Sequence, residues 1–142
     1  MREILFRGKR IDSDEWVYGD LLRARGYVNR IEYTVIFTDP AEFPKGEYFG
    51  AVHILPETVG QYTGLTDKNG KRIFEGDIVD CWSEGVNAKG TVQQRKDGLW
   101  IIYPAWQKTI MWGLCPDKHG HTTVEVIGNI HDNSELIGEA EE

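Results

Sequence analysis

Turns that contain glycine divide this chain at intervals of about ten residues, and their spacing constrains the fold more than any other feature. Glycine occurs 16 times, and a chain that turns so often favours short strands over long helices. The stretches 71–82, 91–104 and 122–130 are rich in β-branched and aromatic residues; the first is interrupted at Glu75-Gly76, and the second bends at Lys96-Asp97-Gly98. The pattern therefore predicts a mostly β fold, in the form of a small barrel or sandwich.

Two β-rich parts and a tail are expected along the chain. Residues 1–60 are predicted to form an N-terminal β-rich lobe, in which Trp16, Tyr18 and Asp20 lie on one face of a strand. Residues 61–133 are predicted to form the small barrel. Residues 134–142 form an acidic tail that is either helical over a short length or disordered. No internal repeat is seen.

The stretch 61–80 has the most specific turn signal of the chain. Asn69-Gly70 supplies the positive φ angles of a tight hairpin turn, and Asp67 is placed to accept hydrogen bonds from the amides of that turn. A calcium loop is excluded, because its fifth and twelfth positions would be Lys71 and Ile78. A phosphate loop is excluded, because no Gly-Lys-Ser/Thr follows a glycine-rich run. The hairpin interpretation sends three side chains into the core: Ile73, Ile78 and Val79.

Glu75 and Asp77 flank Gly76 and leave two interpretations open. Paired carboxylates carry out general acid and base chemistry when their pKa values are driven apart. Alternatively, Gly76 makes a turn or bulge in which the carboxylates accept backbone amides. We favour the structural interpretation of this pair.

The net charge of −7 counts against general nucleic-acid binding, because an acidic chain repels phosphate. A local basic patch within the first 30 residues remains an alternative, although a solvated surface is the simpler interpretation. Its members would be Arg7, Lys9, Arg10, Arg23, Arg25 and Arg30.

The two cysteines, Cys81 and Cys115, are expected to be reduced thiols in a cytoplasmic protein. The start of the chain is charged and lacks the apolar segment of a signal peptide. No apolar run approaches the roughly 18 residues of a membrane span, so no membrane association is expected. No cofactor is predicted.

Cys115, His119 and His121 are weak candidates for a metal site. A thiolate and two imidazoles suit zinc in ligand type. Their spacing matches no common zinc pattern, and a fourth ligand would have to come from a distant residue such as Cys81, His131 or Asp132. A simple turn is the favoured interpretation, and a thiolate–base pair of Cys115 with His119 is likewise less favoured than an incidental arrangement.

Aromatic residues gather on or near the predicted barrel. Aromatic-lined grooves in small barrels bind extended peptides, and Trp and Tyr lead interaction hot spots. Two interpretations of these residues are equally favoured. In the first they pack only in the core, and in the second they also form an interaction interface. The candidate binding residues are Trp82, Trp100, Tyr103, Trp106 and Trp112.

Three stretches of the chain resemble the YopX family of phage and prophage proteins: "EILFRGKRIDSDEWVYGDL", "QYTGLTDKNGKRIFEGDIV" and "EVIGNIHDNSELI". The resemblance implies an SH3-type β-barrel in the C-terminal part, and it implies no known reaction. The segments "DPAEFPKGEYFG" and "AWQKTIMWGLCPDKHG" match no family motif, so nothing is carried over to them.

Three functional hypotheses follow. The first is a non-enzymatic phage or prophage accessory protein in the bacterial cytoplasm that acts through a protein partner or through self-association. The second is a nucleic-acid-binding protein that uses the basic N-terminal patch and the barrel aromatics. The third is a small metal-dependent hydrolase built on Cys115, His119 and His121.

Overall fold

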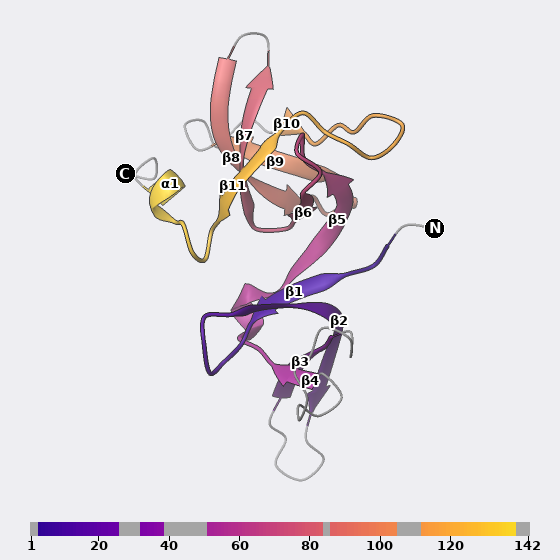
Figure 1. The fold of residues 1–142 in the computed structure, drawn as a ribbon, viewed down its shortest axis with the longest axis vertical. Helices are drawn as coiled ribbons and strands as arrows, with labels where there is room; N and C mark the ends of the chain where they lie inside the picture. Colours follow the sequence, from indigo (N-terminus) through magenta and orange to yellow (C-terminus); the bar gives the residue numbers. More distant parts are fainter. Residues whose placement is uncertain (1–2, 26–31, 39–50, 84–85, 105–111, 139–142) are drawn as a thin grey trace. The chain divides into compact units, whose positions relative to one another are not determined.

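The computed structural model describes residues 3–25, 32–38, 51–83, 86–104 and 112–138 (Figure 1). The chain divides into two compact units, Met1–Gln61 and Tyr62–Glu142, which we call the N-terminal unit and the C-terminal unit. Short antiparallel strands dominate both of them, which confirms the prediction of a mostly β chain. Among the described residues, no helix is long and apolar enough to cross a lipid bilayer.

The N-terminal unit is an antiparallel sheet with the strand order β4-β3-β2-β1. Its strands are β1 (Phe6–Lys9), β2 (Trp16–Arg25), β3 (Glu32–Phe37) and β4 (Ala51–His53). A short 3-10 turn, η2 (Pro56–Thr58), leads into β5 (Gly60–Thr66), whose first residues pair with β1. Because side chains alternate along each strand, the buried residues Val17, Ile36 and Val52 share one face of this sheet.

The packed face of this sheet forms a small apolar core. Val17 of β2, Ile36 of β3 and Val52 of β4 are buried there together with Ile54. Gly19 allows β2 to lie close to β3, since a Cβ atom at this position would stand 2.0 Å from the carbonyl oxygen of Phe37. A side chain at position 19 would therefore push the two strands apart.

The C-terminal unit contains a five-stranded antiparallel sheet with the order β10-β9-β8-β7-β11, and a hairpin formed by the end of β5 with β6. Its further strands are β6 (Arg72–Phe74), β7 (Asp77–Ser83), β8 (Val86–Gln94), β9 (Trp100–Pro104), β10 (Trp112–Gly113) and β11 (Glu125–Asn129). One α-helical turn, α1 (Glu135–Gly138), follows. Residues 139–142 of the predicted tail lie outside the described residues.

The core of the C-terminal unit includes nine buried residues: Ile73, Val79, Cys81, Ala88, Val92, Trp100, Ile102, Leu114 and Val124. Ile73, Ile78 and Val79 are fully buried, which confirms their predicted place in the core. Within the described residues, the sheet ends at β10 and β11 and does not close into a barrel. The SH3-like barrel therefore stays a prediction.

Candidate functional site

The carboxylate of Asp67 is buried, and backbone amides use both of its oxygens. Oδ1 accepts hydrogen bonds from the amides of Asn69 and Lys71 at 2.8 and 2.9 Å, and Oδ2 accepts one from Val126 at 3.0 Å. Burial alone would raise the pKa of Asp67, but these amides outweigh burial and lower the pKa. Asp67 therefore holds the Asn69-Gly70 turn against β11, in agreement with its predicted role as acceptor for the turn's amides.

A second turn repeats this arrangement. The Oδ1 atom of Asp117 accepts hydrogen bonds from the amides of His119 and His121 at 2.8 and 3.1 Å. The glycine before the end of each turn has a positive φ angle, +82° at Gly70 and +84° at Gly120. The sequence signal is the shared Asp-Lys-x-Gly pattern of "DKNGK" and "DKHGH". We missed this repeat in the sequence, because a repeat of five residues falls below the length of a structural repeat unit.

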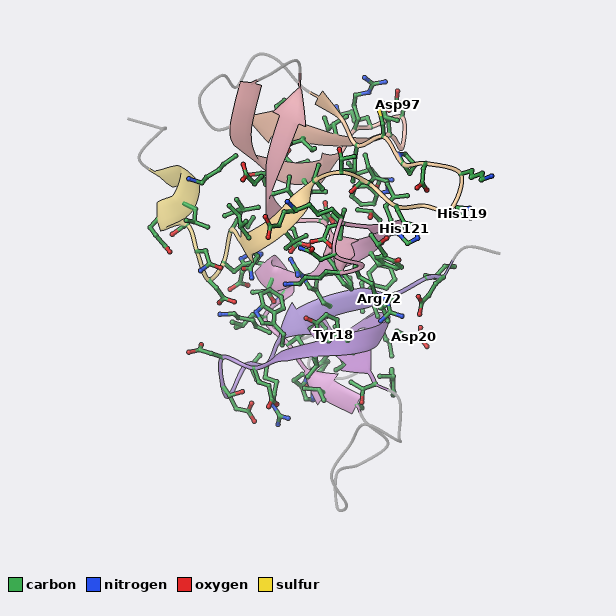
Figure 2. The ribbon with its side chains drawn as sticks, turned by 45° about the horizontal axis from the view of Figure 1, so that its top comes forward. Tyr18, Asp20, Arg72, Asp97, His119 and His121 are labelled. Carbon is green, nitrogen blue, oxygen red and sulfur yellow. The ribbon has the colours of Figure 1, made fainter. Side chains whose placement is uncertain are left out.

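The two turns are bonded to each other through Thr66. Its amide donates to the carbonyl oxygen of Gly120 at 2.9 Å, and its own carbonyl oxygen accepts from the amide of Thr122 at 2.8 Å. The Oγ1 atom of Thr66 also lies 2.7 Å from Nδ1 of His121. Figure 2 shows the labelled side chains of His119 and His121 on this turn. The amide, carbonyl and hydroxyl groups of Thr66 thus join the first turn to the second.

The candidate metal ligands Cys115, His119 and His121 lie in or beside the second turn. No group of three or more His, Cys, Asp or Glu side chains in the described part of the chain is placed to hold a metal ion. The other thiol, Cys81, is buried and lies 3.2 Å from the carbonyl oxygen of Ala88. Burial, with a smaller effect of the Asp80 charge, raises the pKa of Cys81 to about 11. A thiol held protonated in this way is a poor nucleophile.

Asp77 serves the corner between β6 and β7. Its side chain is 1% exposed, and Oδ2 accepts a hydrogen bond from the amide of Phe74 at 2.8 Å. Gly76 has a φ angle of +90°, as a tight corner requires. Glu75, by contrast, is exposed. These contacts support the structural interpretation of the Glu75–Asp77 pair over the catalytic one.

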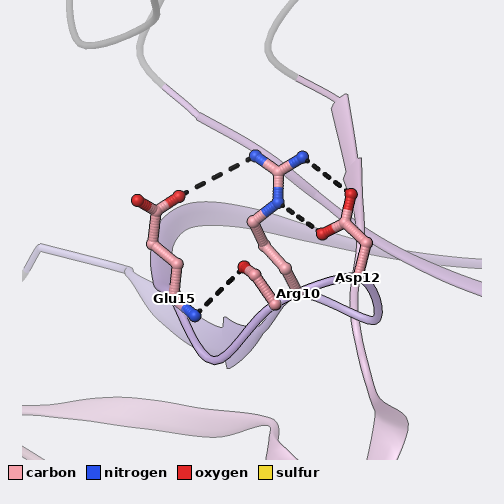
Figure 3. Close-up of polar contacts among 4 residues, drawn as sticks. Arg10, Asp12 and Glu15 are labelled. Atoms are coloured by element: carbon pink, nitrogen blue, oxygen red, sulfur yellow. Dashed lines mark hydrogen bonds and ion pairs between the residues drawn. The ribbon is translucent and has the colours of Figure 1, made fainter.

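The predicted basic patch is divided by local contacts. Figure 3 shows Arg10 between two acids: its Nε atom lies 2.8 Å from Asp12 Oδ1, and its Nη1 atom lies 3.8 Å from Glu15. Arg7 and Lys9 instead lie over the Trp16 ring, 4.7 and 5.6 Å from its centroid. Arg23 is exposed, whereas the side chain of Arg25 and all of Arg30 lie outside the described residues.

The structure describes two side chains of the predicted aromatic binding set. Trp100 is 8% exposed and packs in the core, and Tyr103 of β9 is half-buried. Trp82 and Trp112 lie in β7 and β10, but their side chains are outside the described part, as is the whole of Trp106. The binding role of this set stays a prediction.

The N-terminal unit has a second collection of large apolar side chains, on the face of its sheet opposite the core. We call this surface the outer face and define it by Tyr18, Asp20, Leu22, Val35 and Phe37. Tyr18, Leu22 and Phe37 are 41%, 46% and 39% exposed. Figure 2 labels Tyr18 and Asp20, which belong to the same strand, β2.

The strand register brings these five side chains together. Asp20 of β2 lies directly opposite Phe37 of β3, and Leu22 lies opposite Val35. Directly opposed residues share a face of the sheet, with Cβ atoms about 5 Å apart. Tyr18 lies two residues before Asp20 on the same face. Alternation in the sequence places Tyr18 and Asp20 on one face, as predicted. It does not reveal the whole site, because only the register with β3 brings Phe37 next to Asp20.

The comparisons with known proteins agree with this fold. A family model described as YopX protein matches residues 5–138. The crystal structure of protein EF1440 from Enterococcus faecalis is similar, with a TM-score of 0.52 and 20% sequence identity. That alignment covers 96% of this chain and 99% of the other, and at this identity the likeness shows the fold alone. No curated protein matches the chain.

Proposed function

The chain belongs to the YopX protein family, and from this premise we propose that it is a non-enzymatic protein-interaction module whose contact surface is the outer face. One observation carries the proposal: Tyr18, Leu22 and Phe37 expose large apolar side chains next to one another on a single sheet face. Single exposed apolar residues are ordinary, but a contiguous group of them is typical of an interaction surface.

The strands that carry the outer face are held in place before any partner binds. The side chains of this face project from paired strands, and the packed core on the opposite side fixes those strands. A partner would therefore meet groups that are already ordered and would lose less conformational entropy on binding. Tyrosine, moreover, is enriched among the residues that dominate interface energies.

The polar residues of the family-like stretches support a structural role over a catalytic one. Asp67 and Asp77 are each 1% exposed and accept backbone amides. Asn129 does the same in the third stretch, where its Oδ1 atom accepts the amides of His131 and Asp132, each at 2.9 Å. These side chains are used to hold turns and corners, and the hydrolase hypothesis draws no support from them.

Two further proposals concern the cell compartment in which the protein acts and the fold of the C-terminal unit. We propose a phage or prophage accessory role in the bacterial cytoplasm, which the family-like stretches and two free thiols, Cys81 and Cys115, support. We also propose that the C-terminal unit is an SH3-like barrel. Its support is the antiparallel order of five short strands beside the β5–β6 hairpin.

Nucleic-acid binding is the second candidate, and one observation favours it. Arg7 and Lys9 lie over Trp16, and a combination of cations with an aromatic ring is how many proteins hold single strands. Two observations oppose it: the net charge is −7, and Asp12 and Glu15 pair with Arg10. We therefore rank it below protein binding.

A photo-crosslinking experiment tests the proposed function. A benzoylphenylalanine residue in place of Leu22 should form covalent protein adducts in host cells. The matched control carries the same residue at Leu99, which is 48% exposed on the C-terminal unit. Adducts at position 22 that are absent at position 99 support the outer face, and equal yields at the two positions contradict it.

A further inference from the structure

We infer that the partner of the outer face is a basic protein segment, and that one of its arginine or lysine side chains binds between Asp20 and the rings of Tyr18 and Phe37. The inference rests on the proposed function and specifies the chemistry of the partner. It commits to a protein segment, and binding of nucleic acid is an outcome that would contradict it.

The arrangement around Asp20 carries this inference. Phe37 lies directly opposite Asp20, about 5 Å away between Cβ atoms, and Tyr18 precedes Asp20 on the same face by about 7 Å. Asp20 thus places an exposed carboxylate between two partly exposed aromatic side chains. A cation on an apolar stem matches such a site, because the charge meets the carboxylate while the ring faces attract it further.

Leu22 adds a position for the stem of that side chain. It follows Asp20 by two residues on the same face and is 46% exposed. Lysine and arginine bury their methylene stems against apolar surface while the charged end stays near water or a counter-ion. The outer face therefore offers one contact for the charge and another for the stem.

The same face already contains the proposed type of contact. Arg7 and Lys9 of β1 lie 4.7 and 5.6 Å from the centroid of the Trp16 ring. In the register these two residues are opposite Tyr18 and Trp16, so they share the outer face. Cations on aromatic rings are thus a native feature of this sheet, and a partner's cation at Tyr18 and Phe37 would extend the row.

Charge at long range favours a basic partner. The chain carries 23 acidic and 16 basic side chains, for a net charge of −7. Such a field raises the encounter rate with positively charged segments and lowers it with polyanions. A basic protein segment therefore fits the exposed carboxylate of Asp20 and the charge of the whole chain. The two cations of β1 on this face do not offset that carboxylate, because Arg7 is buried and Lys9 lies half-buried over the Trp16 ring.

Binding of two short labelled peptides tests the inference. In one peptide arginine alternates with leucine, and in the other citrulline, which has a similar shape but no charge, replaces every arginine. Fluorescence anisotropy at low salt would be measured for the full chain and for Asp20→Asn. The control is Asp14→Asn, which removes the same charge from an exposed position in the turn between β1 and β2.

The inference predicts that Asp20→Asn weakens the arginine peptide by about threefold to fivefold, as the loss of an exposed ion pair does. Asp14→Asn should leave that affinity within error of wild type, and the citrulline peptide should bind wild type and Asp20→Asn alike. Equal effects of the two substitutions, equal affinity for the two peptides, or preferred binding of a labelled single-stranded DNA would overturn the inference.

Amide chemical-shift mapping separates this inference from the function on which it rests. The arginine peptide should shift the amide signals of Tyr18, Asp20 and Phe37, and the same spectra show that each variant is folded. If crosslinks form at position 22 but the peptide causes no shifts at these residues, the inference fails and the proposed function stands. If both experiments are negative, both fail.

Discussion

The Oδ2 atom of Asp67 accepts a hydrogen bond from the amide of Val126 at 3.0 Å, across 59 residues of sequence. The other oxygen of the same carboxylate closes the turn that Asp67 begins. One buried side chain thus forms a local turn and fixes that turn to the last strand of the C-terminal unit. Removing its charge should therefore have an effect on the stability of the whole unit.

Asp67→Asn should lower the free energy of unfolding by about 2–3 kcal/mol, because hydrogen bonds to a charged group are worth more than neutral ones. Asparagine presents one oxygen where the carboxylate presents two, so an NH₂ group would face a backbone amide. Urea unfolding followed by circular dichroism measures the change. Asp14→Asn is the exposed control, and a loss below about 0.5 kcal/mol at position 67, within the range of ordinary surface substitutions, would contradict the role assigned to Asp67.

Asp67 should also make stability depend on pH in the acid range. Its pKa is lower in the folded chain than the value of about 3.9 expected for the unfolded chain. Its contribution is therefore fully present above that unfolded pKa and is lost as the pH falls through the lower, folded pKa. Stability measured from neutral pH downward should fall less steeply below about pH 4 for Asp67→Asn than for wild type; parallel curves would argue against this linkage.

Gly19→Ala should destabilise the N-terminal unit by about 3 kcal/mol, the upper range for an overpacked site. The added Cβ would stand 2.0 Å from the carbonyl oxygen of Phe37, where the neighbour is backbone and cannot rotate away. Gly113→Ala is the matched control, because its Cβ would meet Cys115 Sγ at an acceptable 3.4 Å. Thermal unfolding compares the two, and similar melting temperatures would count against the close approach of β2 and β3.

The two thiols should react at very different rates in the folded protein. Cys115 is exposed, whereas Cys81 is buried and its pKa is raised to about 11. At neutral pH an alkylating reagent should therefore label Cys115 quickly and Cys81 only after unfolding. Mass spectrometry of partly labelled protein distinguishes the sites, with denatured protein as the control for full reactivity. Rapid labelling of Cys81 under native conditions would be inconsistent with its place in the core.

Local patterns in the sequence predicted the parts of the fold that depend on neighbouring residues. Asn69-Gly70 indicated the hairpin turn, and Gly70 has the required positive φ angle. Period-2 alternation indicated the strands, and Ile73 and Val79 are fully buried as expected. The family resemblance was also confirmed, because it depends on stretches of sequence that remain contiguous.

The features that sequence did not predict depend on pairing between distant residues. The bond from Val126 to Asp67 requires the β7–β11 pairing, and the outer face requires the register that sets Phe37 opposite Asp20. Alternation along β2 shows that two faces exist, but it does not say which of them is covered. Alternation alone therefore does not predict the exposed group of Tyr18, Leu22 and Phe37, and the binding role of the tryptophans in the second half stays a prediction.

The central claim is that the outer face binds a protein partner, and loss of binding on substitution tests it most directly. Phe37→Ser and Leu99→Ser remove large side chains that are 39% and 48% exposed, on the outer face and elsewhere. Tagged variants with wild-type circular dichroism would be crosslinked in host cells, purified, and compared by quantitative mass spectrometry of the bound proteins. The account predicts that Phe37→Ser loses a partner that Leu99→Ser retains at the wild-type level; full retention by Phe37→Ser would contradict it.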